Sequence, residues 1–135
     1  MRRNHAYHEL NYHLVFVTKN REKWLDRAAL EELRESFSEK AKELSLLLHI
    51  VNGYEDHVHL LVSVPPTLSI AEVSKFLKGY SSRKLGSKYY WARGYAAFTV
   101  DRSSFQRVAI YIEKQEEHHR KGKLNQEEEP PFLNP

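Results

Sequence analysis

Residues 57–64 alternate between two types of position: histidines begin one series, and aliphatic side chains fill the other. Successive side chains of an extended strand point to opposite faces of a sheet, so His57 and His59 should share one face. The aliphatic residues between them should point into a core. Two prolines at positions 65 and 66 end the apolar run, as expected at the end of a strand.

The hydrophobic pattern before this strand predicts a strand, a helix and a hairpin. Residues 10–18 are rich in β-branched and aromatic side chains, which is typical of a strand. Asp26 is the predicted N-cap of a helix that runs to about Leu44, with apolar residues at spacings of three and four. A second strand, 46–51, leads to Asn52-Gly53, a typical tight-turn dipeptide, and then to the histidine strand.

The pattern after the prolines predicts a helix, a strand and a last helix. Ser69 and Glu72 have the spacing of a capping box, and the helix that they begin should stop before Gly86. Residues 96–100 are a predicted fourth strand. Asp101 or Ser103 is then expected to cap a helix over about 104–120, followed by a mobile tail from about residue 121.

The predicted order of elements is β-α-β-β-α-β-α. Its first six elements match the split βαβ pattern, so we expect an α+β fold of ferredoxin-like or RRM-like type. In this fold two helices cover one face of an antiparallel sheet, and the C-terminal helix is an addition. No repeat or linker divides the chain, which predicts one domain over residues 1–135.

The composition narrows the possible functions. With 41% hydrophobic and 29% charged residues the chain is ordinary for a globular protein, and its net charge is only +3. It contains no cysteine, so disulfides and thiolate metal sites are excluded. No apolar stretch is long enough for a signal peptide or a membrane helix, so a cytoplasmic protein without membrane contact is the default expectation.

Two stretches carry candidate chemistry. Neutral imidazole is a common metal ligand, so His57 and His59 on one face suit a divalent ion, although an ordinary strand face carrying two histidines has the same pattern. In the last helix Tyr111, Gln115 and His118 fall within about 60° of one another around the axis. A tyrosine packed at the core boundary beside solvated polar residues is the alternative interpretation there.

A basic and aromatic stretch covers residues 73–100, which contain no acidic residue. Cations suit a nucleic-acid backbone, and aromatic rings suit exposed bases, so single-stranded nucleic acid is a candidate ligand; a solvated basic helix face is the alternative. His13 lies in the first strand and is interpreted as structural rather than as a ligand. The candidate DNA contacts are Lys75, Lys78, Arg83, Lys84, Lys88 and Arg93.

Four separated blocks together resemble one known family. They read DHVHLLVSVPP, LKGYSSRKL, WARGYAAFTV and YIEKQEEHHRK, in that order. The chain is similar, over most of its length, to IS200/IS605-type transposases, the single-strand-specific tyrosine transposases of the HUH (His-hydrophobic-His) nuclease superfamily.

The resemblance implies a mechanism and a set of site residues. His57 and His59 match the pair that binds Mg²⁺ or Mn²⁺, Gln115 the third ligand, and Tyr111 the nucleophile. The family cleaves and rejoins single-stranded DNA through a covalent 5′-phosphotyrosine without ATP. It recognises hairpins near the element ends as a homodimer, in which the tyrosine helix can dock on the partner. The identity of the general base is left open: it is either a metal-bound water or a nearby histidine.

Three alternatives remain at this point. A domesticated relative that processes repeated palindromes would share the same chemistry. A non-catalytic RRM-like nucleic-acid-binding module would share the fold, but the sequence has no RNP-like run of aromatics. A relaxase or replication initiator of the same superfamily is usually larger than 135 residues.

Overall fold

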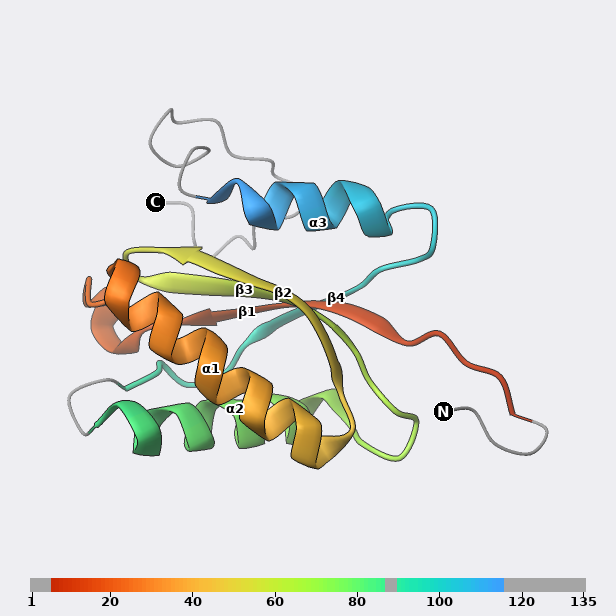
Figure 1. Cartoon of the computed structure of the whole chain (residues 1–135), viewed down its shortest axis with the longest axis horizontal. Helices are drawn as coiled ribbons and strands as arrows, with labels where there is room; N and C mark the ends of the chain where they lie inside the picture. The colour runs from red at the N-terminus through yellow and green to blue at the C-terminus, as the bar shows by residue number, and fades with distance from the viewer. Residues whose placement is uncertain (1–5, 87–89, 116–135) are drawn as a thin grey trace.

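A four-stranded antiparallel sheet forms the centre of the protein. The computed structural model describes residues 6–86 and 90–115. The strands stand in the order β2-β3-β1-β4, which is the split βαβ order (Figure 1). Their bounds are β1 Asn11–Val17, β2 Leu47–Tyr54, β3 His57–Ser63 and β4 Ala96–Thr99.

The helices cover both faces of this sheet. Helices α1 (Arg27–Leu44) and α2 (Ile70–Leu85) lie side by side on one face, and α3 (Phe105–Glu113) lies across the other (Figure 1). The predicted fold class is confirmed. A short 3₁₀ turn, η1 (Lys19–Arg21), follows β1. None of the helices in the described ranges has the length and apolar run that crossing a bilayer requires.

Local capping explains where the first two helices begin and where the second one ends. The Asp26 side chain accepts a hydrogen bond from the backbone N–H of Ala29 at 2.8 Å. Ser69 and Glu72 form the reciprocal capping box that their spacing predicts, and α2 ends at Gly86, whose φ of 114° favours glycine.

The start of α3 differs slightly from the prediction. Ser104, rather than Asp101 or Ser103, is the N-cap, and it makes no side-chain capping bond. Instead the Asp101 carboxylate accepts a hydrogen bond from the Ser104 N–H at 2.8 Å. Asp101 thus stabilises the start of α3 although it lies before the helix. The rest of the predicted helix, 116–120, and the predicted mobile tail lie outside the described residues.

The predicted tight turn at Asn52-Gly53 is wrong. Strand β2 continues through both residues to Tyr54, Gly53 pairs with Val58, and the chain turns at Glu55, whose φ is 57°. A Cβ atom at Gly53 would lie 2.4 Å from the carbonyl oxygen of His57. Glycine is therefore needed here because two backbones approach closely, and the turn falls immediately before the first histidine.

Strand β3 is buried on both of its faces, and the faces differ. Val58, Leu60 and Val62 belong to the main core with α1 and α2, and all three are inaccessible to solvent. On the opposite face Leu61 packs in a smaller cluster under α3, with Val108, Tyr111 and Ile112. The period of two predicted for this strand thus separates a hydrophobic core from the face that carries the histidines.

Candidate active site

The two histidines of β3 lie on the face covered by α3. His57 is 2% exposed and His59 is fully buried, and their ring centroids are 5.2 Å apart. They share this face because they are two residues apart in one strand.

Helix α3 brings two polar side chains to these histidines. The Oε1 atom of Gln115 lies 3.3 Å from Nε2 of His57, and the Tyr111 ring meets the His59 ring edge to face at 6.0 Å. Tyr111 and Gln115 are one helical turn apart and therefore lie on the same side of the helix. The four side chains singled out from the sequence converge within one copy of the chain.

Apolar packing and a hydrogen bond from strand β2 help to fix the position of α3. Val108 and Ile112 pack on Leu61. The Asn52 side-chain amide donates to the Glu113 carbonyl at 2.8 Å and so ties the last turn of α3 to strand β2. These contacts help to fix the position of Tyr111 and Gln115 over strand β3.

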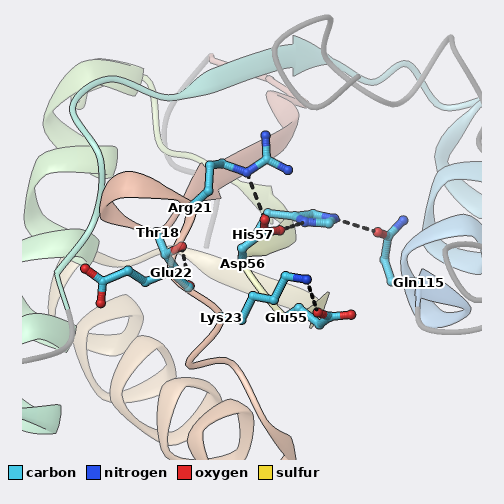
Figure 2. Close-up of polar contacts among 8 residues, drawn as sticks. All are labelled: Thr18, Arg21, Glu22, Lys23, Glu55, Asp56, His57 and Gln115. Atoms are coloured by element: carbon cyan, nitrogen blue, oxygen red, sulfur yellow. Dashed lines mark hydrogen bonds and ion pairs between the residues drawn. The ribbon is translucent and has the colours of Figure 1, made fainter. Parts of the chain in front are cut away.

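Asp56 and Arg21 extend the site behind His57. Asp56 Oδ1 accepts from Nδ1 of His57 at 2.9 Å, and Arg21 Nε donates to the other carboxylate oxygen at 2.9 Å (Figure 2). Burial would raise the pKa of Asp56, but the hydrogen bonds from His57 and Arg21 outweigh it and hold that pKa at about 2. The carboxylate is therefore ionised at neutral pH. Sequence reasoning missed both residues, although an acidic residue directly before the histidine pair was a usable signal.

His13 occupies the corresponding place behind His59. It is 1% exposed, its Nε2 lies 2.7 Å from Nδ1 of His59, and the two rings stack at 5.0 Å. The sequence suggested only a structural role for this residue. Its proximity to His59 follows from the pairing of β1 with β3, in which Val15 is opposite His59, and strand pairing is not visible in the hydrophobic pattern of either strand.

The donor atoms present are compatible with a divalent ion. Two ligands at neighbouring positions of an octahedral ion with bonds of about 2.1 Å are about 3 Å apart, close to the spacing of His57 Nε2 and Gln115 Oε1. Imidazole nitrogen and amide oxygen suit Mn²⁺ and, less well, Mg²⁺. Among the side chains that the structure describes, no group of three or more His, Cys, Asp or Glu is placed to hold a metal. The donors that meet here are the two histidines and the amide oxygen of Gln115.

Four of the six candidate DNA contacts, Lys75, Lys78, Arg83 and Lys84, lie away from this site. All four are on α2, which covers the opposite face of the sheet. Lys75, Arg83 and Arg93 are exposed. Lys84 lies 3.4 Å from Glu39 of α1, an acidic neighbour that the sequence of α2 does not reveal. Lys88 lies outside the described residues.

Lys78 has a structural role that the sequence did not suggest. Its ammonium donates hydrogen bonds to the carbonyls of Ala92 at 2.9 Å and Gly94 at 2.6 Å, and partial burial lowers its pKa. It fastens the segment before β4 onto α2, so its charge is directed to the protein's own backbone rather than to solvent.

A pocket opens beside the histidines between β4 and α3. Its volume is about 550 Å³, and it is lined by His13, Phe98, Thr99, Arg107 and neighbouring residues. The pocket lies on the same sheet face as His59, because His13 lines the pocket and also contacts His59.

Comparisons with known proteins identify the family. A family model described as "Transposase IS200 like" matches residues 6–115. The chain therefore belongs to the IS200-like transposase family and is a transposase by class, which confirms the resemblance seen in the sequence. Among individual relatives, the ISDra2 transposase TnpA of Deinococcus radiodurans is 28% identical over 127 residues, covering 85% of this chain and 91% of the relative. The transposase for insertion sequence element IS200 of Salmonella typhimurium is 26% identical over 133 residues, covering 87% and 84%.

Solved structures agree. The crystal structure of a candidate transposase from Deinococcus radiodurans superposes with a TM-score of 0.69 at 27% identity, covering 85% of this chain and 97% of that one. A REP-associated tyrosine transposase bound to a REP hairpin superposes with a TM-score of 0.68, covering 92% and 76%. At 12% identity the second comparison supports the shared fold alone.

Proposed function

We propose that this transposase cleaves and rejoins single-stranded DNA at transposon ends through a covalent 5′-phosphotyrosine intermediate on Tyr111. One observation carries the proposal: α3 sets Tyr111 against His59 and Gln115 against His57. A nucleophile and a set of donors suited to a cation thus meet at one place. Membership of the IS200-like transposase family supports the same reaction class.

Tyr111 would attack the phosphorus of the scissile phosphodiester through its phenolic oxygen. The phenol loses its proton, the bond from phosphorus to the 3′ oxygen breaks, and the 3′ oxygen takes up a proton. This leaves a free 3′-OH and a phosphate ester joining Tyr111 to the 5′ end. Attack of a 3′-OH on this ester reverses the step and releases the tyrosine. The ester conserves the energy of the broken bond, so strand transfer needs no ATP.

His57, His59 and Gln115 would hold a divalent ion, Mg²⁺ or Mn²⁺. When bound, such an ion polarises a non-bridging phosphate oxygen and orients the phosphate. All three side chains are neutral donors, so they leave the charge of the ion available to the phosphate. The same neutrality predicts weak affinity in the absence of DNA.

The burial of Tyr111 bears on how DNA reaches it. Tyr111 is only 4% exposed, so a DNA backbone gains access only when α3 moves from its position on the sheet. Movement of α3 uncovers Val108 and Ile112, and a second copy of the chain offers the same apolar sheet face to receive them. This supports a homodimer in which α3 completes the site of the partner.

The exposed cations on and after α2 would contact the DNA hairpin through its phosphates. Lys75, Arg83 and Arg93 are solvent-accessible, and Lys84 is partly neutralised by Glu39. Because α2 and α3, the helix of Tyr111, lie on opposite faces of the sheet, a hairpin held on α2 must send its single strand around an edge of the sheet to reach the tyrosine.

The test is adduct formation on single-stranded DNA from the ends of the element, with purified protein and Mn²⁺ or Mg²⁺. Wild-type protein should form a denaturant-resistant protein–DNA adduct, and Tyr111→Phe should form none. Tyr95→Phe is the matched control, because Tyr95 is an exposed tyrosine on the segment before β4. His57→Ala should abolish cleavage but retain hairpin binding. An adduct with Tyr111→Phe would show that the nucleophile is wrongly assigned.

A further inference from the structure

In each histidine of the site the Nδ1 atom faces a partner, and the partner differs between the two. His57 turns Nε2 toward Gln115 and Nδ1 toward Asp56, at 3.3 Å and 2.9 Å. His59 turns Nδ1 toward Nε2 of His13, at 2.7 Å. In both rings a partner outside the donor set faces Nδ1, so Nε2 is the atom with which either histidine would bind a metal ion.

The chemistry of Asp56 decides where the proton of His57 lies. An ionised carboxylate only accepts hydrogen bonds, so the Nδ1 atom that faces it must carry the proton. The lone pair of a neutral His57 ring is then on Nε2, opposite the amide oxygen of Gln115. In that tautomer Nε2 of His57 and Oε1 of Gln115, which lie 3.3 Å apart, would both be acceptors, and both could serve as ligands of a cation.

Asp56 is itself held by two contacts from the segment after β1. The Thr18 N–H donates to the Asp56 carbonyl at 2.9 Å, and Arg21 holds the carboxylate. Arg21 and Asn20 have left-handed φ angles of 56° and 58°, which fold η1 back over the turn before β3. This arrangement fixes the carboxylate on the Nδ1 side of His57 (Figure 2).

We propose that Asp56 and His13 are positioning residues that fix the tautomers of His57 and His59, so that both histidines present Nε2 to the metal ion. The inference rests on the metal site of the proposed function. Metal-binding histidines generally give their other N–H to a carboxylate or another acceptor, and loss of that partner weakens metal binding by about 10- to 100-fold. Nothing in the histidine pair itself selects Nε2; the selection comes from β1, η1 and the turn at Asp56.

The first experiment reads the tautomers directly in the full-length, metal-free protein at neutral pH. Long-range ¹H–¹⁵N correlation spectra of protein labelled with ¹⁵N-histidine should show His57 and His59 protonated at Nδ1. Asp56→Ala should shift His57 toward protonation at Nε2, and His13→Phe should do the same for His59. Protonation of either histidine at Nε2 in the wild type would overturn the proposal.

The second experiment measures Mn²⁺ binding by electron paramagnetic resonance, again without DNA. Asp56→Ala and His13→Phe should each weaken binding about 10- to 100-fold. Asp56→Asn keeps a carbonyl oxygen that can accept from Nδ1, so it should retain the tautomer and lose less affinity; it also serves if Asp56→Ala fails to fold. Unchanged affinity in folded Asp56→Ala and Asp56→Asn, or no Mn²⁺ binding by the wild type, would contradict the proposal.

Matched controls separate positioning from general damage. Glu55→Gln removes the neighbouring carboxylate, which is paired with Lys23 at 3.2 Å rather than with a histidine (Figure 2). His49→Phe replaces an exposed histidine that hydrogen-bonds Ser63 on β3. Both controls should keep wild-type tautomers and Mn²⁺ affinity. Because neither readout involves DNA, a protein that binds Mn²⁺ as described but forms no phosphotyrosine would refute the proposed function and leave this inference intact.

Discussion

Nε2 of His57 lies 3.3 Å from Oε1 of Gln115, although the two residues are 58 positions apart in the sequence. This contact joins the strand that carries the histidines to the helix that carries the tyrosine. Substitution of Gln115 is therefore the most direct test of the donor set.

Replacing Gln115 should change Mn²⁺ affinity in opposite directions according to the charge introduced. Gln115→Glu adds an anionic oxygen at nearly the same position and should strengthen binding about tenfold or more, because carboxylate suits hard divalent ions better than an amide. Gln115→Leu should weaken binding below the wild type. Titration calorimetry with Mn²⁺ checks both variants. Equal affinities for all three proteins would remove Gln115 from the donor set.

Gly53→Ala should damage both the hairpin and the site. The added methyl group would lie 2.4 Å from the His57 carbonyl oxygen, so β2 and β3 must separate, and we expect a loss of about 2 kcal/mol or more in unfolding free energy. Gly79→Ala is the matched comparison. It lies inside α2, its new methyl group meets nothing closer than 3.5 Å, and it should stabilise by about 0.5–1 kcal/mol. Urea denaturation of both variants measures the difference; similar stabilities would contradict the role given to Gly53.

Asp56 should make the metal-free protein sensitive to acid. Its pKa is about 2 in the folded protein against an ordinary 3.8, so its contribution to stability is fully present above pH 4 and is lost as the pH falls toward 2. The contribution is at most about 2 kcal/mol, because the partner Arg21 is half exposed and solvent screens the pair. Denaturation in EDTA between pH 7 and pH 2.5 should show a flatter profile for Asp56→Asn. A profile parallel to that of the wild type would show that Asp56 is not stabilised as described.

The basic residues should divide into structural and DNA-binding groups. Lys78→Met removes two hydrogen bonds to carbonyls and should lower unfolding free energy by about 1–3 kcal/mol. Arg83→Ala should leave stability nearly unchanged and weaken hairpin binding. The slope of the logarithm of affinity against the logarithm of salt concentration should fall by the amount that corresponds to about one phosphate contact. Denaturation and binding measured over a range of salt concentrations distinguish the two. Loss of stability in Arg83→Ala with unchanged binding would reverse the assignment.

The features predicted correctly from the sequence are local in origin. Asp26 and Ser69 cap helices through contacts three residues away, and the alternation around His57 depends only on strand geometry. The convergence of Tyr111 and Gln115 on the histidines was expected because the family resemblance supplied the pairing; the spacing within α3 placed them only on a common helix face.

The features missed depend on contacts between distant segments. Asn52-Gly53 looked like a turn, but the close approach of β3 requires glycine within the strand. Lys78 resembled the other cations of its stretch until the carbonyls of Ala92 and Gly94 were placed around it. His13 could be linked to His59 only through strand pairing, which the sequence of each strand does not specify.

The burial of β3 on both faces has a consequence for how this protein tolerates change. His57 and His59 are core residues as well as candidate ligands, surrounded by the same packing that keeps the sheet folded. The same buried side chains therefore contribute both to stability and to the proposed chemistry. A substitution at either histidine alters the packing of the sheet as well as the donor set, whereas Tyr111→Phe removes only the phenolic oxygen and leaves the ring in its cluster under α3.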